Sequence, residues 1–369
     1  MTTRKKRVGV DVSSLIFSKQ VTGIERVSIE INRGLVNFLD SEEYEVEPFV
    51  TLPEVKKPVN IHPNLELDPI FSKPLGSINS FDILFFGSIN INLPVRELLT
   101  LKQDRDLKVI TLVHDILPIT HPEWFPVPEV PTGRQVTLSS KNAFQIYLQS
   151  SFALSDRLIL TSQHVFDEIM SYRWNKIPEI SIIPLGAFEV PTKNEKISHS
   201  GINTIYLSSV TIRKGHAELL SAFDLLWEQG FDISLTIVGN KGWLIDDFVE
   251  RLQSHPQNGL KLFWKERLLD SEVTELYRIT DIAFITSEDE GFGLVLEEGL
   301  ANDVKVIARD IPVFRERDYP NLYFYSGGPK GLSEKILEVA LLPLEKSASS
   351  TIRTFQDFNV RLAEVLRLV

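Results

Sequence analysis

The amino-acid sequence predicts an α/β protein built from two Rossmann-like, doubly wound domains that face a cleft. Short apolar runs alternate with helical patterns along nearly the whole chain, which is typical of buried parallel strands joined by helices. The chain has 369 residues, of which 43% are hydrophobic and 24% charged, so it is long enough for two domains of ordinary size. In such folds, ligands bind in the cleft, at the carboxyl ends of the strands.

Ten apolar runs are the predicted strands. They lie at 8–12, 83–87, 109–113, 158–161, 181–184, 204–208, 234–238, 261–264, 282–286 and 304–308. The hydrophilic segment 189–203 separates two sets of five runs and is the candidate linker. We therefore predict an N-terminal domain at 1–190 and a C-terminal domain at 191–345. The proline-rich segments 51–75 and 118–133 are expected to form long surface loops.

Composition restricts the chemistry and the partners. The sequence contains no cysteine, which excludes disulfides and thiolate chemistry and fits a reducing cytoplasm. A formal net charge of -11 argues against nucleic acid as the main partner. The basic cluster Arg4–Arg7 runs directly into a strand without a signal-peptide pattern, and no apolar run is long enough to span a bilayer. We expect a cytoplasmic protein, and peripheral contact with an anionic membrane stays open.

The most informative segment follows the predicted strand at 282–286. The glycines of Gly291-Phe292-Gly293-Leu294 allow peptide N–H groups to point outward together, and a helix opening near Gly293 adds the positive end of its dipole. These amides suit a pyrophosphate. Glu298, just over a turn into the helix, can reach back toward neighbouring hydroxyls, and Glu290 can meet a second hydroxyl. A Gly-x-Gly turn after a strand is common in α/β proteins, so the segment alone does not decide the function.

Further candidates follow other predicted strands. Arg213 and Lys214 would stabilise negative charge on a departing phosphate, although a solvated surface pair is the alternative. His114 ends the strand at 109–113 and could instead be a packing or capping residue. Gly23 follows the first strand. The alternative to a binding role for this residue is a loop glycine that the local dihedral angles require. Gly239 ends the strand at 234–238.

The spacing Glu290-Gly-Phe-Gly-Leu-x-x-x-Glu298, with the later Asp310-Ile-Pro-Val-Phe-Arg-Glu316, resembles the retaining family 4 glycosyltransferases, which belong to the glycosyl transferases group 1 and have the GT-B fold. The second segment looks most like bacterial mannosyl- and rhamnosyltransferases that build O-antigen or capsule. This resemblance implies a retaining, metal-independent hexosyltransferase. Its donor would be a nucleoside diphosphate sugar, with no other cofactor, and its acceptor a saccharide.

The resemblance also implies that the N-terminal domain binds the acceptor and the C-terminal domain the nucleotide sugar, and it implies roles for single residues. Glu290 and His114 would contact the donor sugar, and Glu298 the ribose. Gly239 and the segment 264–268 would lie beside the nucleobase, and Gly23 beside the diphosphate or acceptor. Many members carry an arginine where this chain has Ser209, so Arg213 is expected to take its part. The C-terminal segment, 346–369, with a helix at 352–368, is expected to pack back on the N-terminal domain.

Several alternatives stay open. GDP-mannose is the first choice of donor, followed by dTDP-rhamnose or a UDP-hexose, and a non-catalytic glycosyltransferase-like subunit is the rival from another class. A lipid-linked acceptor and the oligomeric state also stay open. We predict no metal site, because Asp104-Arg105-Asp106 precedes its strand and the seven histidines lack ligand spacing. The absence of Gly-x-Gly-x-x-Gly after the first strand and of Gly-x-Ser-x-Gly disfavours dinucleotide oxidoreductases and α/β-hydrolases.

Overall fold

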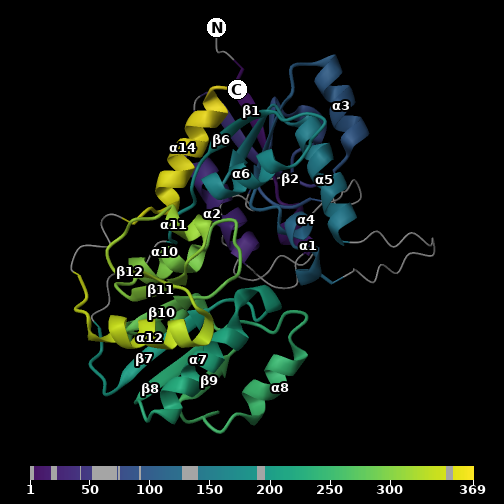
Figure 1. Ribbon diagram of the computed structural model, residues 1–369. Helices are drawn as coiled ribbons and strands as arrows, with labels where there is room; N and C mark the ends of the chain where they lie inside the picture. The colour runs from purple at the N-terminus through teal and green to yellow at the C-terminus, as the bar shows by residue number, and fades with distance from the viewer. Residues whose placement is uncertain are drawn as a thin grey trace. The chain divides into compact units, whose positions relative to one another are not determined.

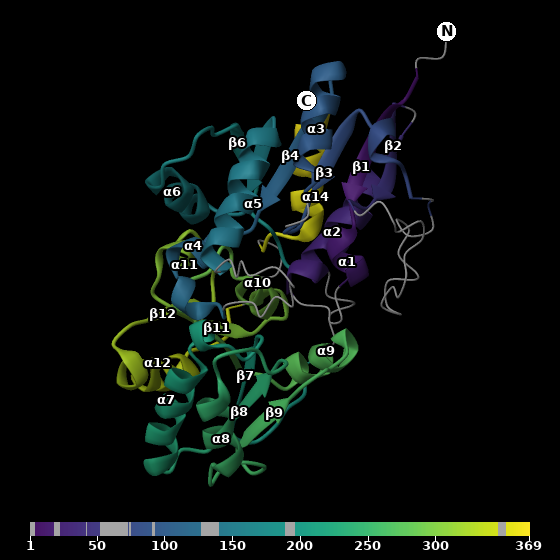
Figure 2. The same ribbon diagram turned by 90° about the vertical axis from the view of Figure 1, so that its right-hand side faces the viewer.

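Two parallel six-stranded sheets organise the computed structural model of the chain (Figures 1 and 2). The structure describes residues 4–17, 23–41, 43–51, 73, 75–90, 93–126, 140–188, 196–345 and 352–369. These residues form two units, the first drawn from 1–122, 127–185 and 354–369 and the second from 123–126 and 186–353. The predicted α/β class with two doubly wound domains is confirmed. In the part of the chain described here, no helix is long and apolar enough to cross a membrane.

The sheet of the first unit has the strand order β2-β1-β3-β4-β5-β6, and all its pairings are parallel. The strands are β1 (Lys6–Asp11), β2 (Tyr44–Phe49), β3 (Ile83–Phe86), β4 (Lys108–Val113), β5 (Arg157–Leu160) and β6 (Glu179–Ile182). Its central strands are apolar because helices cover both faces, and Val8, Val10 and Leu84 are fully buried. The chain passes from β1 outward to β2 and then back across to β3, so the sheet changes winding direction between β1 and β3.

Helices complete the first unit. They are α1 (Ser13–Phe17), α2 (Gly23–Phe38), η3 (Ile78–Ser80), α3 (Val95–Asp104), α4 (Leu117–Thr120), α5 (Ser140–Leu154), α6 (Gln163–Ser171) and α14 (Phe355–Arg367). A further turn, η4 (Pro122–Trp124), lies where the chain passes from the first unit to the short segment Glu123–Pro126 of the second.

The last helix, α14, packs against α2, as both views show (Figures 1 and 2). A capping box between Thr354 and Asp357 starts the helix, and its buried face includes Leu362. Asn359 Nδ2 donates to the backbone oxygen of Glu30 at 3.1 Å. Gly34 makes room for this contact, because a Cβ there would lie 2.0 Å from Asn359 Cγ. The expected return of the C-terminal helix to the first domain is therefore observed.

The sheet of the second unit has the order β12-β11-β10-β7-β8-β9 and is also parallel. Its strands are β7 (Ile202–Leu207), β8 (Ile233–Val238), β9 (Leu262–Lys265), β10 (Ile282–Ile285), β11 (Lys305–Arg309) and β12 (Leu322–Tyr325). Its helices are η5 (Ile212–Lys214), α7 (His216–Glu228), α8 (Asp246–Ser254), α9 (Asp270–Arg278), α10 (Leu294–Ala301), α11 (Pro312–Arg315) and α12 (Gly328–Leu341). Here the winding changes direction between β7 and β10.

The structure contains the ten predicted strands and adds two, β2 and β12, which each lie at an edge of a sheet. The expectation of a loop from 118 onward was wrong for its first part, where α4 and η4 form. Pro118 stands in the first turn of α4, a position in which proline is favourable. The predicted domain boundaries at 190/191 and 345/346 lie outside the described residues, as do 52–72 and 127–133 of the predicted loops.

Candidate functional site

Two loops of the second unit leave the same edge of the sheet side by side. One follows β7 and leads through η5 into α7, and the other follows β10 and leads into α10. Because β7 and β10 are neighbouring parallel strands, with Ala283 opposite Ile205, both loops begin at adjacent carboxyl ends. The winding of the sheet changes direction between these strands, which is where open α/β sheets bind ligands.

Hydrogen bonds fasten the first loop to the second. The carbonyl oxygen of Lys214 accepts from the Tyr206 hydroxyl at 2.6 Å and from Thr286 Oγ1 at 2.9 Å. The amide of Glu288 donates to the carbonyl of Arg213 at 2.9 Å. The backbone that carries both cations is therefore held against the segment that leads to Glu290.

Gly215 makes this close approach possible. Its φ is +70°, and a Cβ there would lie 2.2 Å from the carbonyl oxygen of Thr286. We expect Gly215→Ala to lower the free energy of unfolding by about 2 kcal/mol or more, measured by chemical denaturation, through left-handed strain and the clash. The control is Gly230→Ala, where φ is +82° but the described residues place no atom within 4 Å of the added Cβ. If Gly215→Ala lowered the free energy of unfolding no more than Gly230→Ala does, the proposed clash at Gly215 would be contradicted.

An ion cluster joins the two loops. The buried carboxylate of Glu290 is ion-paired with the Lys214 ammonium through Oε1 and lies 3.1 Å from Arg213 Nη1 through Oε2. Ser287 Oγ also donates to Oε1, at 2.7 Å. Burial alone would raise the pKa of Glu290, but the charges of Lys214 and Arg213 outweigh it and lower the pKa to about 2. The cluster therefore holds two cations and a permanent carboxylate at the carboxyl edge.

The glycine turn lies beside this cluster. Gly293 has a φ of +92° and caps the N-terminus of α10, whose first N–H groups lack partners within the helix. Their orientation and the helix dipole favour a bound anion. The Phe292 side chain is buried, so this residue offers its backbone, and Leu294 is the first residue of α10. Glu298 is buried further along the same helix.

The segments predicted to lie beside a nucleobase come together at the ends of β8 and β9. The carbonyl of Gly239 accepts from Trp264 Nε1 at 2.9 Å, and Asn240 Oδ1 accepts from the amide of Arg267 at 3.0 Å. Gly239 approaches the first loop so closely that a Cβ would lie 1.8 Å from the carbonyl oxygen of Ser208. Ser209, where an arginine was expected, is exposed.

The first unit holds the two remaining predicted residues. His114 follows β4, and its Nε2 lies 3.0 Å from the carbonyl oxygen of Gly87, which follows β3. Burial lowers the pKa of His114, so the neutral ring is favoured near pH 7. Gly23 begins α2, and no described atom lies within 4 Å of a Cβ added there.

Two contributors were absent from the sequence prediction. Ser287 could have been noticed, because it lies between the strand β10 and Glu290. Arg317 lies beyond the quoted motif, and its side chain is 1% exposed and lies 3.2 Å from Glu297 Oε1. Its burial and its partner arise from the folded chain and have no signal in the sequence pattern.

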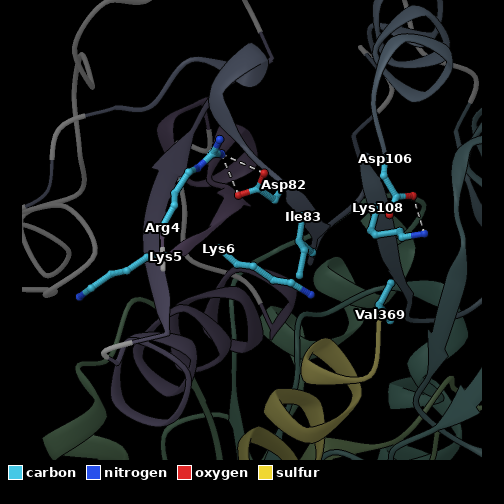
Figure 3. Close-up of a pocket in the computed structure, with 8 residues that line it drawn as sticks. All are labelled: Arg4, Lys5, Lys6, Asp82, Ile83, Asp106, Lys108 and Val369. Carbon is cyan, nitrogen blue, oxygen red and sulfur yellow. Dashed lines mark hydrogen bonds and ion pairs between the residues drawn. The ribbon is translucent and has the colours of Figure 1, made fainter. Parts of the chain in front are cut away.

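A hollow lies at the amino edge of the sheet of the first unit (Figure 3). Arg4, Lys5, Lys6 and Lys108 contribute cations to it, but Arg4 Nη2 lies 3.0 Å from Asp82 Oδ1 and Lys108 Nζ lies 2.8 Å from Asp106 Oδ1. These internal pairs reduce the positive potential of the basic N-terminal cluster. Because ligands of such sheets bind at the carboxyl edge, this hollow is a weaker candidate for the substrate site.

Comparison with known proteins places part of the chain in a family. A family model described as glycosyl transferases group 1 matches residues 192–352. The serotype-specific mannosyltransferase WbdA of Escherichia coli is 32% identical over 256 residues, which cover 64% of this chain. The chain spans only about 30% of the length of that relative.

Two solved structures resemble the whole chain. Sucrose-phosphate synthase from Thermosynechococcus elongatus matches with a TM-score of 0.69 and 13% identity, covering 99% of both chains. HepE from Anabaena, solved with UDP and glucose, matches with a TM-score of 0.65 and 17% identity, covering 99% of this chain and 100% of its own. At these identities the likeness concerns the fold. Residues 192–352 therefore match the group 1 glycosyl transferases, and the whole chain has the GT-B fold.

Proposed function

We propose that this protein is a retaining, metal-independent glycosyltransferase that moves a hexose from a nucleoside diphosphate sugar to a saccharide acceptor. The ion cluster of Arg213, Lys214 and Glu290 beside the glycine turn carries the proposal. Its two cations can bind a diphosphate, and its carboxylate can bind sugar hydroxyls. Both lie at the edge where such sheets bind ligands.

The proposed chemistry uses charge and position. Departure of the nucleoside diphosphate leaves growing negative charge on its β-phosphate, which Lys214, Arg213 and the amides of 291–294 would stabilise. In front-side attack, the leaving phosphate itself takes the proton of the acceptor hydroxyl. Glu290, with His114 from the first unit, would orient the sugar.

The remaining predicted roles complete this proposal. Glu298 would bind the ribose, Gly239 would lie beside the nucleobase, and Gly23 would allow backbone to approach the diphosphate or acceptor. Arg213 would take the part of the family arginine that Ser209 replaces, which its contact with Glu290 supports.

We propose GDP-mannose as the donor and bacterial surface polysaccharide synthesis in the cytoplasm as the setting. The motif at Asp310–Glu316 and the mannosyltransferase name of the relative support this choice. dTDP-rhamnose and UDP-hexoses are the other donors to compare, with lipid-linked and free saccharides as acceptors.

Nucleotide release from GDP-mannose, dTDP-rhamnose and UDP-hexoses, with and without a panel of oligosaccharides, tests the proposal. We expect acceptor-dependent release that is fastest with GDP-mannose, unchanged by EDTA and lost in Glu290→Ala and Lys214→Ala. NMR of the product should show the donor's anomeric configuration retained. Binding of nucleotide without turnover of any donor would indicate a non-catalytic subunit instead.

A further inference from the structure

We infer that Arg317, held by its buried partner Glu297, is a positioning residue that orients the peptide amide of Gly293 toward the diphosphate of the donor. The inference rests on the proposed function, because it concerns the same glycine turn. Arg317 would act without touching the ligand.

Arg317 uses its whole guanidinium group inside the second unit. Nε donates to Glu297 Oε1 at 3.2 Å, Nη1 donates to the carbonyl of Val313 at 2.5 Å, and Nη2 donates to the carbonyl of Phe292 at 2.8 Å. The group also stacks on the Phe292 ring, with Cζ 4.1 Å from the ring centroid. One side chain thus connects the glycine turn, the first turn of α10 and α11.

The contact with Phe292 determines which way the next amide points. A trans peptide is planar, so its carbonyl and its N–H point in opposite directions. Because Arg317 holds the carbonyl of Phe292 from the protein interior, the N–H of Gly293 points away from Arg317. That N–H adjoins the first amides of α10, where we place the diphosphate.

The geometry of the turn leaves little freedom for another orientation of the peptide between Phe292 and Gly293. A Cβ on Gly293 would lie 2.5 Å from a ring carbon of Phe314 in α11, the helix whose Val313 also accepts from Arg317. Arginine is suited to this task because its planar fork donates in three fixed directions, whereas a lysine is a compact point charge.

Stability alone is a weak explanation for this pair. The side chains of Arg317 and Glu297 are 1% and 0% exposed, so both charges have been taken out of water. Replacing such a pair with apolar side chains of similar volume is often neutral or stabilising, whereas removing one partner is costly. A double replacement therefore separates positioning of the turn from folding.

The test uses the double variant Glu297→Leu with Arg317→Leu, and the single variant Arg317→Lys as a second probe. Calorimetry measures binding of GDP, UDP and dTDP and of their nucleosides to each folded protein. For the nucleotide that the wild type binds, we expect about a tenfold loss of diphosphate affinity, the effect of one lost charge-assisted hydrogen bond. Affinity for the nucleoside should stay unchanged, since we place the nucleoside away from the turn.

Arg315→Leu is the matched control, because this arginine lies two residues away, is exposed and pairs with Asp310. It should leave both affinities as in the wild type. Unchanged diphosphate affinity in the folded variants would overturn the inference, and so would an equal loss for diphosphate and nucleoside. A wild type that binds none of the three nucleoside diphosphates would instead overturn the proposed function itself.

Discussion

Replacing Glu290 by glutamine is expected to remove transfer activity while strengthening the response of the protein to a nucleoside diphosphate. The substitution keeps the shape of the side chain but deprives Lys214 and Arg213 of its carboxylate charge. We expect kcat/KM to fall by roughly 10²- to 10³-fold, the effect of removing one preorganised polar group at a reacting centre. A nucleoside diphosphate then supplies the missing anion, so its addition should raise the Tm of Glu290→Gln more than that of the wild type.

The effect of Glu290→Gln on the free energy of unfolding should depend on pH. The pKa of Glu290 is lowered to about 2 from 4.5, so its ionised form stabilises the folded state by about 3 kcal/mol. For a lowered carboxylate pKa, this stabilisation is complete above 4.5 and is lost as pH falls toward 2. The difference in unfolding free energy between wild type and Glu290→Gln should therefore shrink over that window.

Glu288→Gln is the control for both measurements, because Glu288 is exposed and lies two residues before Glu290. It should change neither the transfer rate nor the nucleotide-induced shift in Tm. If Glu290→Gln retained transfer, or if its Tm shift equalled that of the wild type, Glu290 would have no part in holding the cations ready for the donor.

Lys214→Met is expected to lower kcat by roughly 10²- to 10³-fold, because it keeps an apolar stem but removes the charge that would stabilise the departing diphosphate. It should also raise the pKa of Glu290, since Lys214 contributes the largest lowering effect on that group. Steady-state kinetics with the donor identified in the nucleotide panel measure the first effect. The pH dependence of unfolding measures the second.

The matched control is Lys261→Met. Lys261 pairs with Asp232 at 3.1 Å, and both precede strands, so they lie at the amino edge of the same sheet. This variant should keep the transfer rate of the wild type. If Lys214→Met lost stability but kept its rate, Lys214 would serve only to neutralise Glu290.

The interior strands could be predicted because burial on both faces makes them continuous apolar runs. Two of the four edge strands, β2 and β12, were not predicted. β2 contains two glutamates and Pro48, which a strand paired on only one side tolerates. Arg7 pairs with Glu47 at 2.7 Å and so compensates a charge inside the strand. β12 has only four residues and follows Asn321, which has a φ of +64°.

The cation and glutamate motifs could be predicted to meet because they follow runs that become neighbouring strands. Their detailed pairing could not be predicted. Whether both cations would share one carboxylate depends on the turn at Gly215, and the contribution of Arg317 depends on a partner twenty positions away in the chain. Such contacts follow from tertiary packing and leave no periodic signal in the sequence.

The return of α14 to α2 has a consequence for how the chain folds during synthesis. The ribosome delivers 186–353 before α14, so the core of the second unit can close first, as domains that fold as units do. The first unit cannot bury Leu362 and Asn359 until α14 has been synthesised as well. The contact between Asn359 and Glu30 joins residues 329 positions apart, and such non-local contacts slow folding. Completion of the first unit therefore depends on a helix that is synthesised after the second unit.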